Sequence, residues 1–259
     1  MKSLYWALCA LFLVGCSTLP IDDRYRASGQ NSRVQYVVLH YTSADLPRSL
    51  QLLTQGEVSS HYLLGESPAT IYRLVDEDRR AWHVGDSAWQ GRTWLNASTI
   101  GIELVNQGYS DVNGQRQWQA FAPEQIEALV VLLKDIVERH QLPRGSIIAH
   151  SDVAPQRKVD PGPLFPWQRL AEEGLIDWPD EQAVVLQQEL FSHELPSTLW
   201  FQQQLARQGY TVAQDGVLDK ATQNVLAAFQ MKYRPAKYDG VPDAETAARL
   251  RVLNEQMGR

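Results

Sequence analysis

The sequence predicts an α/β protein, in which a mixed β-sheet flanked by helices is followed by a second, small domain of three helices. Two observations lead to this fold class. Short apolar runs typical of buried strands, together with one long amphipathic segment, occupy residues 34–149. Near the C-terminus, a turn motif recurs after 24 residues and opens a helix each time. With 259 residues, the chain is also long enough for more than one domain.

Residues 1–15 are predicted to be a signal peptide. Lys2 carries the only early charge, and the apolar run that follows ends at Val14. That run is shorter than the roughly 17 to 25 residues that a membrane-spanning helix needs. Leu13-Val14-Gly15-Cys16 is similar to the lipobox at which bacterial lipoproteins are cleaved and acylated, so Cys16 is the expected lipidation site. The alternative is an ordinary signal peptide followed by an unmodified cysteine.

The next segment, residues 16–33, is predicted to be the lipidated cysteine and a flexible tether. It lacks apolar periodicity, and fully extended it would reach at most about 55 to 60 Å. By resemblance to Gram-negative lipoproteins, Ser17 favours sorting to the outer membrane, with the protein on the periplasmic face. The net charge of −6 makes nucleic acid an unexpected partner.

The first folded domain is expected over residues 34–178. Its long helix is predicted at 123–140, where Pro123 occupies the first turn and its missing N–H costs nothing. Apolar residues recur along one face of this segment, which indicates a helix that packs on a sheet. The predicted strands are 34–40, 61–64, 71–75, 99–105 and 146–149.

A linker with a short helical stretch is expected over residues 179–196, and the helical domain over residues 197–259. Asp215-Gly216 and Asp239-Gly240 each begin a turn that leads to an aspartate suited to capping a helix. These repeats lack the closely spaced oxygen ligands of a calcium loop. They are therefore interpreted as structural turns.

The run from His150 to Pro163 combines residues that suit a zinc site. His150 offers an imidazole and Asp160 a carboxylate, and a catalytic zinc site uses three protein ligands and leaves one position for water. His40 is the leading candidate for the third ligand, because it is the last residue of an apolar segment that is typical of a buried strand. His61 and His83 are its serious competitors among the six histidines.

Five motifs carry a resemblance to a known family. The chain resembles the zinc-dependent N-acetylmuramoyl-L-alanine amidases of the peptidoglycan-recognition superfamily, in the outer-membrane lipoprotein form with a C-terminal peptidoglycan-binding-like domain. The resemblance implies the zinc amidase fold and one Zn²⁺ per chain, bound by His40, His150 and Asp160. It also implies that His61 and His83 line or support the cleft without binding zinc. The motifs are VVLHYT at 37–42, VSSHYLL at 58–64, RAWHVG at 80–85, IGIELVN at 100–106 and the 150–163 run.

Two further residues are candidates for catalysis. Glu103 lies in an otherwise apolar strand, where an unpaired carboxylate is expensive to bury. A salt bridge inside the sheet is the alternative explanation, whereas the resemblance implies the catalytic proton acceptor. Lys158 precedes Asp160 by two residues and can point the same way, so its ammonium could stabilise a developing oxyanion. The expected substrate contacts are Tyr41, Thr42, His61 and Ser151.

The predicted function is zinc-dependent hydrolysis of the amide between N-acetylmuramic acid, intact or 1,6-anhydro, and the L-alanine of the stem peptide. Alternatives are a non-hydrolytic peptidoglycan-recognition lipoprotein and a structural lipoprotein, although the latter leaves Glu103 unexplained. The expected partners are peptidoglycan, muropeptides and, through the anchor, the membrane. We expect a monomer. Because every proposed catalytic residue precedes Pro161, we also expect the helical domain to be dispensable for small soluble substrates.

Overall fold

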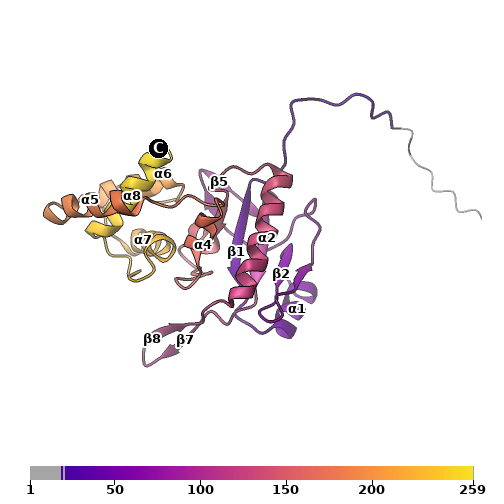
Figure 1. Cartoon of the computed structure of the whole chain (residues 1–259), viewed down its shortest axis with the longest axis horizontal. Helices are drawn as coiled ribbons and strands as arrows, with labels where there is room; N and C mark the ends of the chain where they lie inside the picture. Colours follow the sequence, from indigo (N-terminus) through magenta and orange to yellow (C-terminus); the bar gives the residue numbers. More distant parts are fainter. Residues whose placement is uncertain (1–18, 20, 259) are drawn as a thin grey trace, which may run out of the picture. The chain divides into compact units, whose positions relative to one another are not determined.

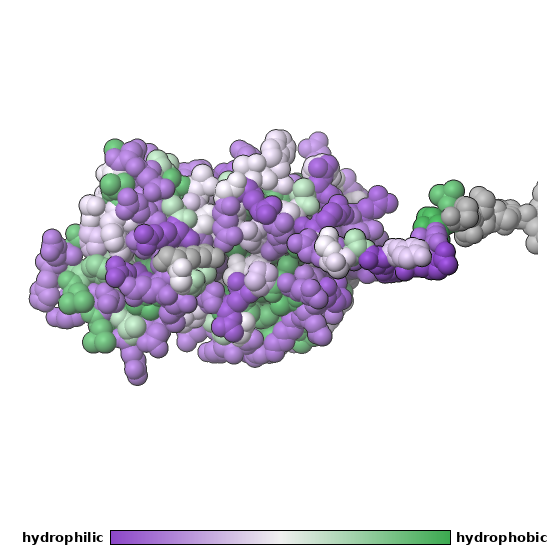
Figure 2. Space-filling view, turned by 90° about the horizontal axis from the view of Figure 1, so that it is seen from above, coloured by the Kyte–Doolittle hydropathy of each residue, from purple (hydrophilic) through white to green (hydrophobic). Residues whose placement is uncertain are grey.

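The computed structural model describes residue 19 and residues 21–258, so the predicted signal peptide and Cys16 lie outside the described residues. The chain divides into two compact units, Met1–Asn31 and Ser32–Arg259. The described part of the first unit contains no helix or strand. Within the described range, no helix has both the length and the apolar character needed to cross a membrane. Polar residues cover most of the face drawn in Figure 2.

A five-stranded mixed sheet forms the centre of the fold (Figure 1). Its strand order is β3-β2-β6-β1-β9, in which β3 is antiparallel to β2 and the other neighbours are parallel. The predicted fold class is thus confirmed. The bounds are β1 Tyr36–Tyr41, β2 Tyr62–Leu64, β3 Ile71–Arg73, β6 Thr99–Leu104 and β9 Ile147–Ala149. Two hairpins lie outside this sheet, formed by β4 Ala88–Trp89 with β5 Arg92–Thr93, and by β7 Tyr109–Val112 with β8 Gln115–Trp118.

The predicted long helix is α2, Pro123–His140, and it packs its apolar stripe on one face of the sheet. Gln125 is buried in this interface, where its side-chain amide donates to the backbone carbonyls of Leu64 and Val105 at 3.1 and 3.0 Å. It thereby joins the helix to the end of β2 and to the residue that follows β6. The other helices of this part are α1 Leu46–Gln55, the short 3₁₀ helix η1 Leu95–Ala97, α3 His150–Val153 and α4 Trp167–Glu172.

The alternation of side chains along β1 decides which face carries His40. Val37 and Leu39 belong to the core beneath α2, whereas Tyr36 and Val38 belong to a second core on the opposite face. Because successive side chains in a strand point to opposite faces, His40 continues the series of Tyr36 and Val38. It therefore lies on the face away from α2.

Side chains alternate between the two faces along the neighbouring strand β6 as well. Ile100 and Ile102 lie in the core beneath α2, so Gly101 and Glu103 face the other way. In the parallel register of β1 and β6, His40 is the partner of Glu103. A predicted metal ligand and the predicted proton acceptor are consequently side by side on one face.

Four helices, α5 to α8, form what we call the C-terminal module. The three expected helices are present, and each begins after a side-chain cap from Ser197, Asp219 or Asp243. The helical stretch expected within the linker over 179–196 is present, and residues Glu181–His193 form it as α5. This helix packs along α8. The bounds of the others are α6 Thr198–Gln208, α7 Lys220–Tyr233 and α8 Ala244–Gln256.

The C-terminal module and the sheet share one hydrophobic core. Phe201, Phe229 and Leu250 of the module are fully buried in the same cluster as Val38 of β1 and Ile148 of β9. The module therefore covers part of the sheet face that α2 leaves open. In Figure 1, α2 and α7 lie on opposite sides of β1.

Candidate active site

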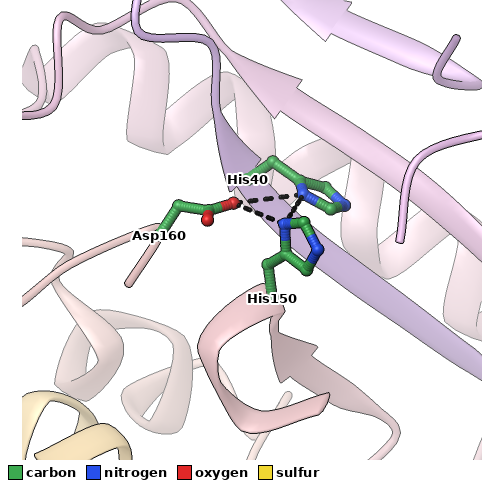
Figure 3. A group of neighbouring side chains, drawn as sticks. All are labelled: His40, His150 and Asp160. Atoms are coloured by element: carbon green, nitrogen blue, oxygen red, sulfur yellow. Dashed lines mark hydrogen bonds and ion pairs between the residues drawn. The ribbon is translucent and has the colours of Figure 1, made fainter. Parts of the chain in front are cut away.

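Three side chains converge at the carboxyl ends of adjacent strands. His40 lies near the end of β1, and His150 is the first residue of α3, directly after β9. Asp160 comes from the loop that follows α3. Because β1 and β9 are parallel neighbours, their carboxyl ends meet at one edge of the sheet. Figure 3 shows the three side chains pointing toward one another.

The distances within this cluster match a metal site. The Nδ1 atoms of His40 and His150 are 2.9 Å apart, and Asp160 Oδ2 lies 3.2 Å from the first and 2.9 Å from the second. Ligands that surround zinc as a tetrahedron at about 2.0 to 2.1 Å are separated by roughly 3.3 Å. All three residues are buried, and their ligand atoms lie within 4.8 Å of one another. Two imidazole nitrogens and one carboxylate oxygen are donors suited to zinc.

The surroundings of His150 fix which of its ring nitrogens carries the proton. Its Nε2 lies 3.3 Å from the carbonyl oxygen of Val84, which can only accept a hydrogen bond. Nε2 therefore donates, and Nδ1 keeps its lone pair toward the cluster. The guanidinium of Arg157 also donates to the carbonyls of Val84 and Asp86, so it holds the backbone of residues 84–86 in place.

A chain of hydrogen bonds fixes His40 in the same way. His40 Nε2 lies 3.0 Å from His83 Nδ1, and His83 Nε2 lies 3.0 Å from Thr99 Oγ1, whose hydroxyl donates to the carbonyl of Leu95 at 2.8 Å. The chain ends on an acceptor, so His83 Nε2 donates to Thr99 Oγ1, and His83 Nδ1 accepts from His40 Nε2. His40 Nδ1 is left as a lone pair, and supporting contacts of this kind orient histidine ligands in metal sites.

Both histidine lone pairs and the carboxylate thus face one small space. Burial, and then the neighbouring charge of His150, lower the pKa of His40 to about 4. Burial would raise the pKa of Asp160, but the positive charge that His150 and His40 carry when protonated outweighs it and holds the pKa below its usual range. At pH 7 His40 is therefore a neutral imidazole and Asp160 an ionised carboxylate, which are the forms that bind a cation.

Gly101 makes room for the supporting histidine. A Cβ built on Gly101 would lie 2.5 Å from the ring of His83, which rests against the sheet at this position. Burial, and then the charge of His40, hold the pKa of His83 well below its usual value, so this ring stays neutral. Gly101 was not among the predicted site residues. A glycine inside an apolar strand is nevertheless the signal for a close approach of another group.

Glu103 lies beside the cluster without a salt bridge to any described residue. Its side chain lines the cleft, and its Oε2 atom is buried with no hydrogen-bond partner among the described residues. Burial, and then the charge of Asp160, raise the pKa of Glu103 well above its usual value, while the charge of Lys158 opposes them. The alternative of a salt bridge inside the sheet is therefore wrong. A buried polar atom without a partner points to a role at the cleft.

The cleft that contains these groups has a volume of about 800 Å³. Lys158 lines it, half-buried, beside Asp160. Tyr41 and Thr42 also line it, as expected for substrate contacts. Two aromatic residues of the cleft were not among the predicted contacts, namely Trp82, which is 51 % exposed, and Tyr109 from the β7–β8 hairpin.

The other two predicted substrate contacts are contradicted by the structure. His61 is 0 % exposed, and both of its ring nitrogens are used, since Nδ1 accepts from the Gly101 N–H at 3.0 Å and Nε2 lies 3.3 Å from the Arg79 carbonyl. Ser151 is 2 % exposed, and its backbone N–H donates to the Asp160 carbonyl at 2.9 Å. Both residues support the site from behind.

Comparisons with known proteins agree with this geometry. The family described as N-acetylmuramoyl-L-alanine amidase matches residues 30–163, and a putative peptidoglycan binding domain matches residues 195–250. The N-acetylmuramoyl-L-alanine amidase AmiD of Escherichia coli (strain K12) is 41% identical, and the alignment covers 100% of both chains.

Solved structures of two relatives share the fold. The first is the complex of AmiD from E. coli with the substrate anhydro-N-acetylmuramic acid-L-Ala-D-gamma-Glu-L-Lys. It aligns with a TM-score of 0.84 and 41% identity over 92% of this chain and 95% of that one. The second, AmpDh3 from Pseudomonas aeruginosa, aligns with a TM-score of 0.86 and 37% identity over 93% of this chain and 100% of that one.

Proposed function

This chain belongs to the N-acetylmuramoyl-L-alanine amidase family, and we propose that it is a zinc-dependent member that uses Glu103 and Lys158 in catalysis. Its activity is hydrolysis of the amide bond between N-acetylmuramic acid and the L-alanine of the stem peptide. The observation that carries the proposal is the convergence of His40, His150 and Asp160 in the cleft that also holds Glu103.

The donor set supports zinc as the metal. Two histidine lone pairs and a carboxylate oxygen face one another at 2.9 to 3.2 Å, an arrangement that is repulsive unless a cation lies between them. When bound there, zinc supplies Lewis-acid polarisation of the amide carbonyl and lowers the pKa of a bound water. All three donors come from one chain, which supports one zinc per chain and an enzyme that works as a monomer.

The chain's own residues supply the remaining chemistry. Glu103, in its ionised form, takes a proton from the attacking water and passes it to the amide nitrogen as the C–N bond breaks. The products are the lactyl carboxylate of the sugar and the free amine of L-alanine. Lys158 carries a positive charge at the same cleft and stabilises the negative charge that develops on the carbonyl oxygen.

We propose that the substrates include the 1,6-anhydro form of the sugar. AmiD was solved with an anhydro-N-acetylmuramic acid peptide, and AmpDh3 with an anhydromuramic pentapeptide. The cleft here, of about 800 Å³, has the size of a site for a large ligand. The match of residues 195–250 to a putative peptidoglycan binding domain supports the wall itself as a second partner.

The test is the mass of the products. The zinc-loaded protein should release free stem peptides from purified anhydro-muropeptides and from sacculi, whereas protein stripped with a chelator should release none until zinc is restored. Protein handled identically with excess zinc present is the control. Full release by the stripped protein would contradict zinc dependence, and products cut at another bond would contradict the assigned reaction.

We further propose that the enzyme is a lipoprotein of the outer membrane, anchored through Cys16 on the periplasmic face. The lipobox-like Leu13-Val14-Gly15-Cys16 supports the anchor. Cys16→Ser should shift the protein from the membrane fraction to the soluble fraction, because no other lipidation site is proposed. Cys9→Ser, inside the predicted signal peptide, is the matched control and should stay with membranes. Membrane association of both variants would refute the anchor, and recovery of the wild type with inner membranes would refute the location.

A further inference from the structure

Asp152 is a buried carboxylate two residues beyond the predicted ligand His150. Only 1 % of it is exposed. Its Oδ2 accepts a hydrogen bond at 2.8 Å from the backbone N–H of Ala149, the residue just before α3. This contact ties the carboxylate to the start of the helix, as in half of a capping box.

The partners of this carboxylate come from the C-terminal module. Lys232 of α7 places its Nζ 2.9 Å from Asp152 Oδ2, and the hydroxyl of Tyr210, just after α6, donates to Oδ1 at 2.6 Å. Lys232 is 6 % exposed and Tyr210 is 4 % exposed, so the whole cluster is withdrawn from water. Removing one partner of a buried pair leaves an uncompensated charge, which disrupts its surroundings more than the loss of an exposed contact does.

The position of α3 depends on such contacts. With four residues, from His150 to Val153, the helix is far shorter than the roughly 12 residues at which an isolated helix becomes marginally stable. Its orientation is therefore set by what holds its ends. Because His150 is its first residue, a displacement of Asp152 and of the Ala149 N–H displaces the imidazole as well.

A second contact of the module reaches the segment after another ligand. Tyr238 accepts a hydrogen bond at 2.7 Å from the indole of Trp118 in β8. The Trp118 ring packs on Gly162, where a Cβ would lie 2.6 Å away, and Gly162 follows Asp160 by two residues. The C-terminal module thus contacts structures that flank two of the three proposed ligands.

We propose that Lys232 and Tyr210 are positioning residues for the metal centre, acting on His150 through Asp152. This inference rests on the proposed zinc site. It assigns the C-terminal module a role beyond wall binding and argues against the expectation that the module is dispensable for small soluble substrates. The charged contact fixes Asp152, Asp152 fixes the start of α3, and α3 presents the His150 Nδ1 lone pair.

The test is the zinc affinity of full-length variants, measured by competition with a chelator at a temperature at which each variant is folded. Lys232→Met should weaken zinc binding by about tenfold, the lower end of what supporting residues contribute in metal sites. The double variant Asp152→Asn with Lys232→Met should recover most of that affinity, because it keeps the cap and removes the unpaired charge. Tyr210→Phe, which loses only a hydroxyl, should show a smaller loss in the same direction.

Two control variants separate positioning from general stability. Val252→Ala opens a small cavity between α8 and α5, and Asn224→Ala removes a hydrogen bond of 2.9 Å to Gln156 at the edge of the module. Both should bind zinc like the wild type. Wild-type affinity in Lys232→Met and Tyr210→Phe would overturn the inference, as would equal losses in Val252→Ala. A wild-type protein that binds no zinc would instead overturn the proposed function. If Lys232→Met does not fold, Tyr210→Phe and the double variant decide the question.

Discussion

Replacing Glu103 with glutamine should lower the rate of amide hydrolysis by at least about a hundredfold, the range contributed by a positioned proton acceptor. Glutamine keeps the shape of the side chain and cannot take the proton. Because Glu103 is not among the proposed ligands, zinc should remain bound at the level of the wild type. The Oε2 atom has no hydrogen-bond partner among the described residues, so the substitution should disturb few other contacts.

The measurement is turnover of a soluble anhydro-muropeptide at saturating concentration, together with the zinc content of the same preparation. Glu57→Gln, an exposed carboxylate of the same type, is the matched control and should leave both unchanged. Near-normal turnover of Glu103→Gln would show that another group moves the proton. A variant that loses its zinc as well would place Glu103 in the metal site.

Replacing His40 with alanine should abolish both stoichiometric zinc binding and hydrolysis. One of three proposed donors is lost, and the hydrogen bond from Nε2 to His83 is lost with it. The wild type should contain about one zinc per chain. His193→Ala, an exposed histidine of α5, is the matched control and should retain metal and activity. Full activity in a metal-free His40→Ala protein would refute the metal assignment.

The sequence was a good guide to the elements that surround the site. Strands such as β1 and β9 are continuous apolar runs because both faces of the sheet are covered, and α2 carries a full apolar stripe. The resemblance supplied the ligand set, which the structure brings together within 4.8 Å. Glu103 was recognised as a candidate because an unpaired carboxylate in an apolar strand costs free energy to bury.

It was harder to predict where a single polar side chain points and how deeply it is buried. His61 and Ser151 adjoin cleft motifs, but their side chains are buried behind the site, since pairing of buried polar groups depends on partners distant in sequence. Helix α5 was expected only as a short helical stretch within a linker, because its apolar pattern is weak. Val184 is its one fully buried residue, whereas Val185 and Leu190 remain exposed.

The shared core beneath the C-terminal module has a consequence for how the wall is processed. Phe201 and Phe229 are packed in one cluster with the sheet, so there is no hinge between module and cleft across this interface. If the module binds a glycan strand, this packed interface fixes the distance and the angle at which the stem peptides of that strand reach the cleft.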